Sequence, residues 1–223
     1  MASPSPPSES PAKLLSAILR LVQDTIVPLT REGVASGSKL FGAAVLARSD
    51  LRPLTVATNN ERLSPLLHGE VNCIQSFFAV DFPDPATRPD PRRDCLFFAT
   101  HEPCSLCLSA IAFAGFGSFY YLFTHDDSRR LFSIPYDIDV LQEVFCVRGG
   151  ETGETAEGRR LYNRSNKFFE GRSLADVVAE IDDPAERQKW REETQRVKDM
   201  YDSLHQGYQE AMSAGVATSS VWK

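Results

Sequence analysis

The sequence carries little positive charge and contains no long apolar run. In 223 residues, 24 lysines and arginines face 30 aspartates and glutamates, so the net charge is −6 and the isoelectric point is about 5.3. This acidic balance disfavours nucleic acid as a partner without ruling it out, because proteins that track phosphates present a basic face. No apolar stretch approaches the roughly 18 residues of a membrane span. Met1–Pro11 lacks the basic and apolar regions of a secretory signal. We therefore expect a soluble, cytoplasmic protein with no membrane partner.

Cysteine is also scarce. The chain has five cysteines, at positions 73, 95, 104, 107 and 146. An odd number that includes a Cys-x-x-Cys pair indicates metal chemistry and not a disulfide framework. Thiolate ligands suit a reducing compartment. Hydrophobic residues make up 42% of the sequence, which is enough for a substantial core.

Hydrophobic patterning predicts alternating helices and strands. A helix is expected from the Ser10-Pro11 cap to about Pro28, and a hairpin from residues 40–47 and 54–58. Helices should begin near Pro65–His68 and at Pro103. A strand should follow each of them, at residues 95–100 and 118–123. Residues 81–94 read as a Pro-rich surface insertion. A short helix (137–142), a fifth strand (143–147), a linker (149–158) and C-terminal helices (174–181, then from Asp183-Pro184 past Met212) should follow.

Two short motifs carry the chemistry. The first is His68-Gly69-Glu70, and after a gap of 32 residues comes Pro103-Cys104-Ser105-Leu106-Cys107. One imidazole and two thiolates are good zinc ligands, and three protein ligands leave the fourth position open for water. The pattern matches the general signature of zinc deaminases, in which the Glu transfers protons and does not bind the metal.

The spacing of these residues favours one shared metal ion. Cys104 and Cys107 are three residues apart, so they share one face of a first helical turn. A helix N-terminus also favours thiolate over thiol. A closed, purely structural zinc site would need a fourth ligand; however, Cys73 should point to another helix face, and Cys95 begins a strand.

These motifs resemble the cytidine deaminase-like superfamily, and most of all its branch of cytosine, guanine, tRNA-adenosine and dCMP-type deaminases. Phe41-Gly42-Ala43-Ala44-Val45 resembles the first strand of that branch, and Ser64-Pro65-Leu66-Leu67-His68 resembles its approach to the histidine. The resemblance covers about residues 13–147. It implies a three-layer α/β/α sandwich with a five-stranded mixed sheet, commonly a homodimer. The expected organisation is a disordered tail (1–12), a zinc-dependent deaminase domain (13–148), and a linker with a helical C-terminal extension (149–223).

The expected reaction is hydrolytic deamination with Zn²⁺ as cofactor. Zinc lowers the pKa of bound water towards ~7, and Glu70 would shuttle protons to the ring nitrogen and to departing ammonia. The substrate would be a small amino-heterocycle: a nucleobase, nucleoside, nucleotide or related compound. A tRNA-editing adenosine deaminase is the second interpretation. A non-catalytic partner subunit is the third, and the intact Glu70 argues against it.

Contacts to substrate are expected from loops near the metal motifs. Asn59 or Asn60 would be the polar contact, although Asn59 lies nine residues before His68 where relatives have about eleven. The other residues that we expect near substrate are Gly69, His101, Pro103, His125 and Asp126. Each has a plain alternative: a strand-end turn for the asparagines, a surface-loop histidine for His101, and a solvated turn for His125 and Asp126.

Overall fold

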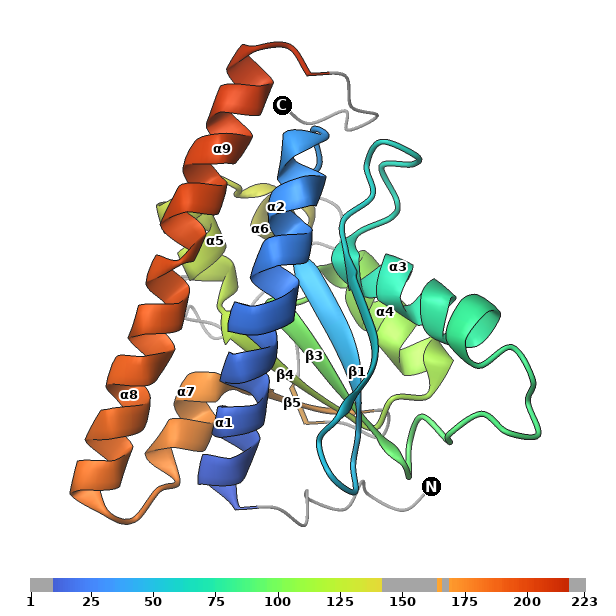
Figure 1. Cartoon of the computed structure of the whole chain (residues 1–223), viewed down its shortest axis with the longest axis vertical. Coiled ribbons are helices and arrows are strands. Elements are labelled where there is room, and N and C mark those ends of the chain that lie inside the picture. Colours follow the sequence, from blue (N-terminus) through green and yellow to red (C-terminus); the bar gives the residue numbers. More distant parts are fainter. Residues whose placement is uncertain (1–9, 142–163, 166–168, 217–223) are drawn as a thin grey trace, which may run out of the picture.

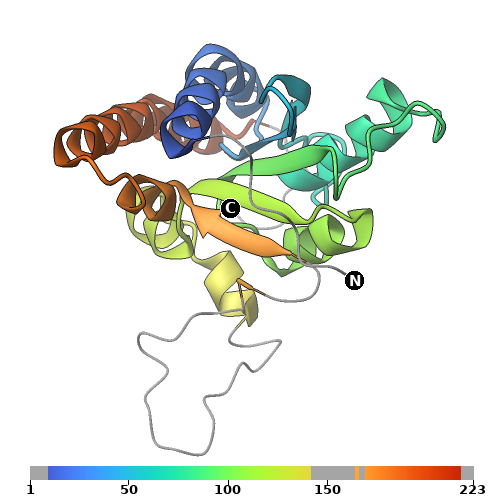
Figure 2. The ribbon, with the colours of Figure 1, turned by 90° about the horizontal axis from the view of Figure 1, so that it is seen from below.

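A five-stranded sheet divides the molecule into two helical layers (Figures 1 and 2). The structure is a computed structural model that describes residues 10–141, 164–165 and 169–216. The strands are β1 (Gly42–Ala47), β2 (Pro53–Thr58), β3 (Cys95–His101), β4 (Ser118–Phe123) and β5 (Glu170–Ser173). Their order across the sheet is β2-β1-β3-β4-β5. β1 is antiparallel to β2 and β3, whereas β3, β4 and β5 are parallel. The predicted mixed α/β/α sandwich is therefore confirmed.

One face of the sheet is covered by helices from both ends of the chain. These are α1 (Pro11–Leu21), the π-helical segment η1 (Val22–Ile26), α2 (Val27–Ala35), α7 (Leu174–Ala179), α8 (Pro184–Asp199) and α9 (Tyr201–Ser213). Figure 1 shows α8 and α9 alongside α1 and α2. The first helices and the last helices thus form one layer.

The opposite face carries the two helices that bear the metal motifs. They are α3 (Gly69–Ser76), which continues as the π-helical segment η2 (Phe77–Asp81), and α4 (Ser105–Ala114). α5 (His125–Phe132) and α6 (Tyr136–Asp139) follow β4. Among the helices of the described residues, none combines the length and the apolar character that a membrane span requires.

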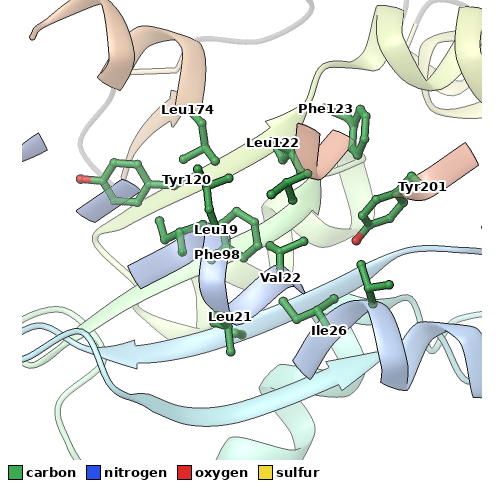
Figure 3. Close-up of a cluster of buried hydrophobic side chains, with 14 of the residues drawn as sticks. Leu19, Leu21, Val22, Ile26, Phe98, Tyr120, Leu122, Phe123, Leu174 and Tyr201 are labelled. Atoms are coloured by element: carbon green, nitrogen blue, oxygen red, sulfur yellow. The ribbon is translucent and has the colours of Figure 1, made fainter. Parts of the chain in front are cut away.

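The strands supply both cores by alternation. Successive side chains of a strand point to opposite faces. Phe98, Tyr120 and Leu122 pack with the α1, α7, α8 and α9 layer (Figure 3). Phe97 and Tyr121 pack with α3 and α4. All the residues of β3 and β4 are buried, as expected for parallel strands covered on both sides.

The first helix does not end near Pro28, as the sequence suggested. Proline has no amide hydrogen and clashes with the carbonyl four residues earlier in an α-helix. Here the chain widens into η1, where the Val27 N–H donates to the Val22 carbonyl five residues back. Pro28 then occupies the first turn of α2, where its missing hydrogen is tolerated, and the helix runs on to Ala35.

Other elements also differ from the sequence prediction. The segment beginning at His125, expected as a turn, is helix α5. The strand beside β4 is β5, from the predicted C-terminal extension. The strand predicted at 143–147 and the linker at 149–158 lie outside the described residues. Of the predicted tail, residues 1–9 also lie outside them, whereas Pro11 already begins α1.

Candidate metal centre and active site

The two sequence motifs meet at the starts of two neighbouring helices. His68 is the N-cap of α3, and Cys104 is the N-cap of α4. His68 Nδ1 lies 3.5 Å from Cys104 Sγ and 3.6 Å from Cys107 Sγ. The three ligand atoms all lie within 4.8 Å of one another, and no other such cluster of His, Cys, Asp or Glu occurs in the described residues. Zinc catalytic sites take three protein ligands of these types, so the donor set fits zinc.

The electrostatics of the cluster favour a metal-binding thiolate. The Cys107 thiol and the His68 ring both hydrogen-bond to Cys104, and these bonds lower the pKa of Cys104 well below its ordinary value. Burial and the bond to Cys104 raise the pKa of Cys107. Burial alone would lower the pKa of His68, but the bond to Cys104 and the thiolate charge outweigh it and raise that pKa to about 9. Metal binding would therefore displace protons from His68 and Cys107.

Glu70 lies in the first turn of α3, two residues after His68. Its side chain is 6% exposed. Burial, and then the negative charge of Cys104, raises the pKa of Glu70 to about 7. A carboxyl group in this range can both accept and release a proton near neutral pH.

Gly69 allows α3 to start close to the sheet. A Cβ at this position would lie 3.0 Å from the Gly42 Cα and 3.0 Å from the Phe41 carbonyl oxygen, both backbone atoms. The Gly69 N–H donates to Asn59 Oδ1 at 2.6 Å, so the end of β2 holds the helix start. The Asn60 N–H donates to the Leu67 carbonyl at 2.8 Å, which closes the loop before His68.

The Pro103–Cys104 turn is held by a second polar group. Glu102 is buried and accepts a hydrogen bond from the His125 backbone N–H at 3.0 Å. The Arg164 Nη2 atom lies 3.3 Å from Glu102 Oε1. The His125 ring Nε2 lies 3.2 Å from the Pro103 carbonyl oxygen. His125 thus contacts the metal-bearing turn.

None of the seven residues expected to contact substrate, His101 and Asp126 among them, lines the cavity beside the metal ligands. His101 is buried against the rings of Phe41, Phe123, Phe132 and Tyr201. Burial lowers the pKa of His101, so the ring is neutral. Asp126 is half-exposed and forms ion pairs with Arg129 and Arg130. Cys73 and Cys95 lie in the core with α3 and α4.

A cavity of about 330 Å³ opens beside the metal ligands. Its volume falls at the small end of the range for ligand pockets. Residues from four loops, from α4 and from α6 with its C-cap line it: Lys39, Phe41, Glu61, Pro65, Leu66, His68, Cys104, Ser105, Leu106, Ile134, Tyr136, Asp137 and Val140.

Three charged residues of this wall were not singled out from the sequence. Lys39 Nζ lies 2.7 Å from Glu61 Oε1, and their side chains are 8% and 1% exposed. Burial, and then the charge of Cys104, raises the pKa of Asp137 to about 6. Glu61 directly follows Asn59-Asn60, which is a weak signal. Nothing in the sequence pairs it with Lys39, 22 positions away.

One known family model matches the part of the chain that carries both metal motifs. Residues 22–123 match the family model of the cytidine and deoxycytidylate deaminase zinc-binding region. No curated protein matched the chain.

Several solved structures are similar to parts of this chain. A guanine deaminase from Nitrosomonas europaea is 16% identical over 86% of this chain and 88% of its own, with a TM-score of 0.43. A guanine deaminase from Bacillus subtilis is 25% identical over 66% and 85%, with a TM-score of 0.44. A structure from work on A-to-I editing by tRNA:A34 deaminases is 21% identical over 46% and 74%, with a TM-score of 0.38.

The matched family region contains His68, Cys104 and Cys107, which are positioned to hold the metal. Residues 22–123 are therefore similar to the zinc-binding region of cytidine and deoxycytidylate deaminases, and three side chains of this region are placed to hold a metal ion.

Proposed function

We propose that this protein is a zinc-dependent hydrolytic deaminase, a hydrolase of C–N bonds in cyclic amidines. It would replace the amino group of a nucleobase, nucleoside, nucleotide or related heterocycle by a keto group and release ammonia. The supporting observation is the position of Glu70. Its buried carboxyl group lies in the first turn of α3, directly after the ligand His68, and a cavity opens beside His68 and Cys104.

The proposed roles follow from position. When bound to His68, Cys104 and Cys107, zinc would supply a Lewis acid that activates water for attack. Glu70 accepts the proton of the attacking water and delivers it to a ring nitrogen of the substrate. Glu70 then takes the remaining proton of the newly added hydroxyl group and passes it to the departing amino group, so that the C–N bond breaks as the keto group forms. One water is consumed and one ammonia leaves for each substrate, and the chain itself is unchanged.

Asn59 is a proposed polar contact to substrate. It is 2% exposed, and its side chain hydrogen-bonds to Glu61, which lines the cavity. Its Oδ1 atom is used by Gly69, which fixes the amide orientation. Gly69, Asn60 and Pro103 would contribute through the backbone that surrounds the metal ligands.

Replacing Glu70 by Gln tests the reaction. Glutamine keeps the size of the side chain but cannot carry the proton, so ammonia release should fall by at least ~10²-fold. Zinc content, measured by elemental analysis, should stay at one per chain. The assay should cover cytosine, guanine and adenine, their nucleosides and nucleotides, pteridine-like compounds and an adenosine-containing tRNA anticodon stem-loop. Full turnover by the Gln variant would refute the role of Glu70, and turnover of the stem-loop alone would favour tRNA editing.

Removing the metal provides a separate test. Dialysis against a chelator should abolish ammonia release, and added zinc should restore it. A protein that is purified without chelator and contains no zinc would contradict the whole proposal.

We also propose that the protein is cytoplasmic, because the reducing conditions of the cytoplasm suit thiolate ligands.

We further propose that the protein forms a homodimer. The support for the dimer is an apolar face on α4, where Phe113 is 93% exposed and Leu106 is 40% exposed. Phe113→Glu should yield a monomer in light scattering coupled to gel filtration. Leu131→Glu, at a half-exposed position on α5, is the matched control and should leave the mass unchanged. A wild-type monomer would refute the dimer.

A further inference from the structure

A buried ion pair forms part of the wall of the metal cavity. Lys39 Nζ lies 2.7 Å from Glu61 Oε1, and the Lys39 backbone N–H donates to Glu61 Oε2 at 2.6 Å. Both residues line the same cavity as His68 and Cys104. The pair is therefore placed where it can act on whatever occupies the cavity.

A structural role alone does not account for charge at this position. The pair does tie the segment before β1 to the loop after β2, and the Ser38 hydroxyl accepts the Glu61 N–H. However, a buried ion pair loses its hydration, and apolar residues of similar volume often hold such segments equally well or better. A ligand, in contrast, can use an ammonium group as a strong hydrogen-bond donor.

The surrounding charges select the kind of group that Lys39 can bind. Glu61 and Asp137 bring two carboxyl groups to the same cavity wall. A phosphate would be held against both of them and repelled. An uncharged carbonyl oxygen can accept a hydrogen bond from the ammonium group without this repulsion.

We propose that Lys39 recognises a ring carbonyl of an uncharged amino-heterocycle and thereby determines substrate specificity, an inference that rests on the deaminase function proposed above. The substrate class is then an amino-heterocycle that carries a carbonyl on its ring, such as cytosine or guanine. Adenine-type rings, which lack the carbonyl, and nucleotide phosphates would be poor ligands of this wall.

Paired substrates test this inference. 4-Aminopyrimidine is cytosine without its ring carbonyl and the adjoining ring hydrogen, and 2-aminopurine has the same relation to guanine. Each pair keeps the reacting amino group. The variant is the double substitution Lys39→Met with Glu61→Met, which removes both charges together so that neither is left buried alone.

For the pair that the wild type turns over, the double variant should lose about 10- to 100-fold in kcat/KM on the carbonyl compound, as expected for a lost charge-assisted hydrogen bond. The loss should come mainly from an increase in KM. For the carbonyl-free analogue, kcat/KM of the double variant should stay within about three-fold of the wild-type value. Lys39→Arg, which keeps the charge, should recover part of the loss. Lys198→Met is the matched control, because Lys198 pairs with Asp127 at 3.1 Å and does not line the cavity. Zinc content and unfolding midpoint are measured for every variant.

Equal losses on both members of a pair, or no loss, would overturn the inference. A wild-type preference for nucleotide monophosphates that disappears in the double variant would overturn it as well. The same ligands can be titrated calorimetrically into the Glu70→Gln protein with and without the double substitution. If no compound releases ammonia, the proposed function fails, and these dissociation constants alone decide whether Lys39 recognises the carbonyl.

Discussion

Glu61 depends on Lys39 for its charge. Burial would raise the pKa of Glu61, but the ion pair and hydrogen bonds with Lys39, with a smaller contribution from a hydrogen bond to Asn59, outweigh it and hold that pKa below the ordinary value of 4.5. A carboxyl group with a lowered pKa in the folded state stabilises the protein above its unfolded pKa, and this contribution is lost as pH falls through the folded value. Stability should therefore decrease on acidification below about pH 4.5.

The double variant Lys39→Met with Glu61→Met isolates this contribution. Its urea unfolding midpoint should change less than that of the wild type between pH 6 and pH 3. Other carboxyl groups titrate in both proteins, so the difference between the two curves is the relevant quantity. Superimposable pH profiles would show that the pair contributes nothing to acid stability.

Replacement by alanine should have opposite effects on stability at two glycines, Gly171 and Gly207. A Cβ on Gly171 in β5 would lie 2.5 Å from the Phe119 Cζ atom, so Gly171→Ala should destabilise the protein by about 1–3 kcal/mol through overpacking. A Cβ on Gly207 in α9 would meet only Val34, at 3.6 Å. Gly207→Ala should therefore stabilise the protein by about 0.5–1 kcal/mol, because glycine is unfavourable inside a helix. Urea unfolding of both variants checks the signs, and equal signs would contradict the packing argument.

Sequence reasoning found the part of the site that is local in the chain. His68 and Glu70 are two residues apart, and Cys104 and Cys107 are three apart, so each motif could be read without the fold. The Lys39–Glu61 pair could not be, because 22 residues separate its members and neither belongs to a pattern. His101 was expected near substrate, but the alternation of β3 turns its ring into an aromatic cluster. Its contact with substrate stays a prediction.

At the level of elements, the β3–α4 connection is tied to a distant segment. Glu102 accepts from the His125 N–H and pairs with Arg164, and the His125 ring reaches the Pro103 carbonyl. Glu102→Gln would weaken both contacts to Glu102 and loosen the turn that positions Cys104. Zinc affinity should fall by about 10- to 100-fold, the usual effect of losing a group that orients a metal ligand.

Competition with a coloured zinc chelator measures this change. Glu180→Gln is the matched control, because Glu180 pairs with Arg172 on the surface away from the metal ligands. Unchanged zinc affinity in Glu102→Gln would mean that the turn holds its shape without the carboxylate.

Most helices and strands could be predicted where the hydrophobic periodicity and the flanking turn residues indicate the same element. The β1–β2 hairpin, β3 and β4 were expected within a residue or two, and Gly115 does end α4 in the left-handed conformation at φ 86°. The helix at His125 was missed although its capping box, Thr124 with Asp127, is a recognisable start signal. β5 could not be found, since its four residues, Glu-Gly-Arg-Ser, show no apolar alternation and the strand that they join in the sheet, β4, lies far earlier in the chain.

For the whole molecule, the C-terminal segment is part of the core. α7, α8 and α9 contribute eight buried side chains to the cluster of Figure 3: Leu174, Val177, Val178, Trp190, Val197, Tyr201, Leu204 and Tyr208. At about 2 kcal/mol for each buried side chain, their loss would exceed the ~5–15 kcal/mol stability of a typical domain.

A chain that ends at residue 148 should therefore not fold cooperatively. Near-ultraviolet circular dichroism and urea unfolding of this fragment should show no sharp transition, and a fragment of residues 149–223 added in trans should restore one. A cooperative transition of 1–148 alone would establish it as an independent domain, the division first expected from the sequence.

The place of β5 at the end of the sheet also sets an order in time. Ser173 follows Cys107 by 66 positions, and ribosomes add roughly 5–20 residues per second. The three metal ligands thus emerge several seconds before the strand and helices that complete the sheet. A zinc ion captured in this interval would join the starts of α3 and α4 while the opposite face of the sheet is still open, and so act as an early fixed point of folding.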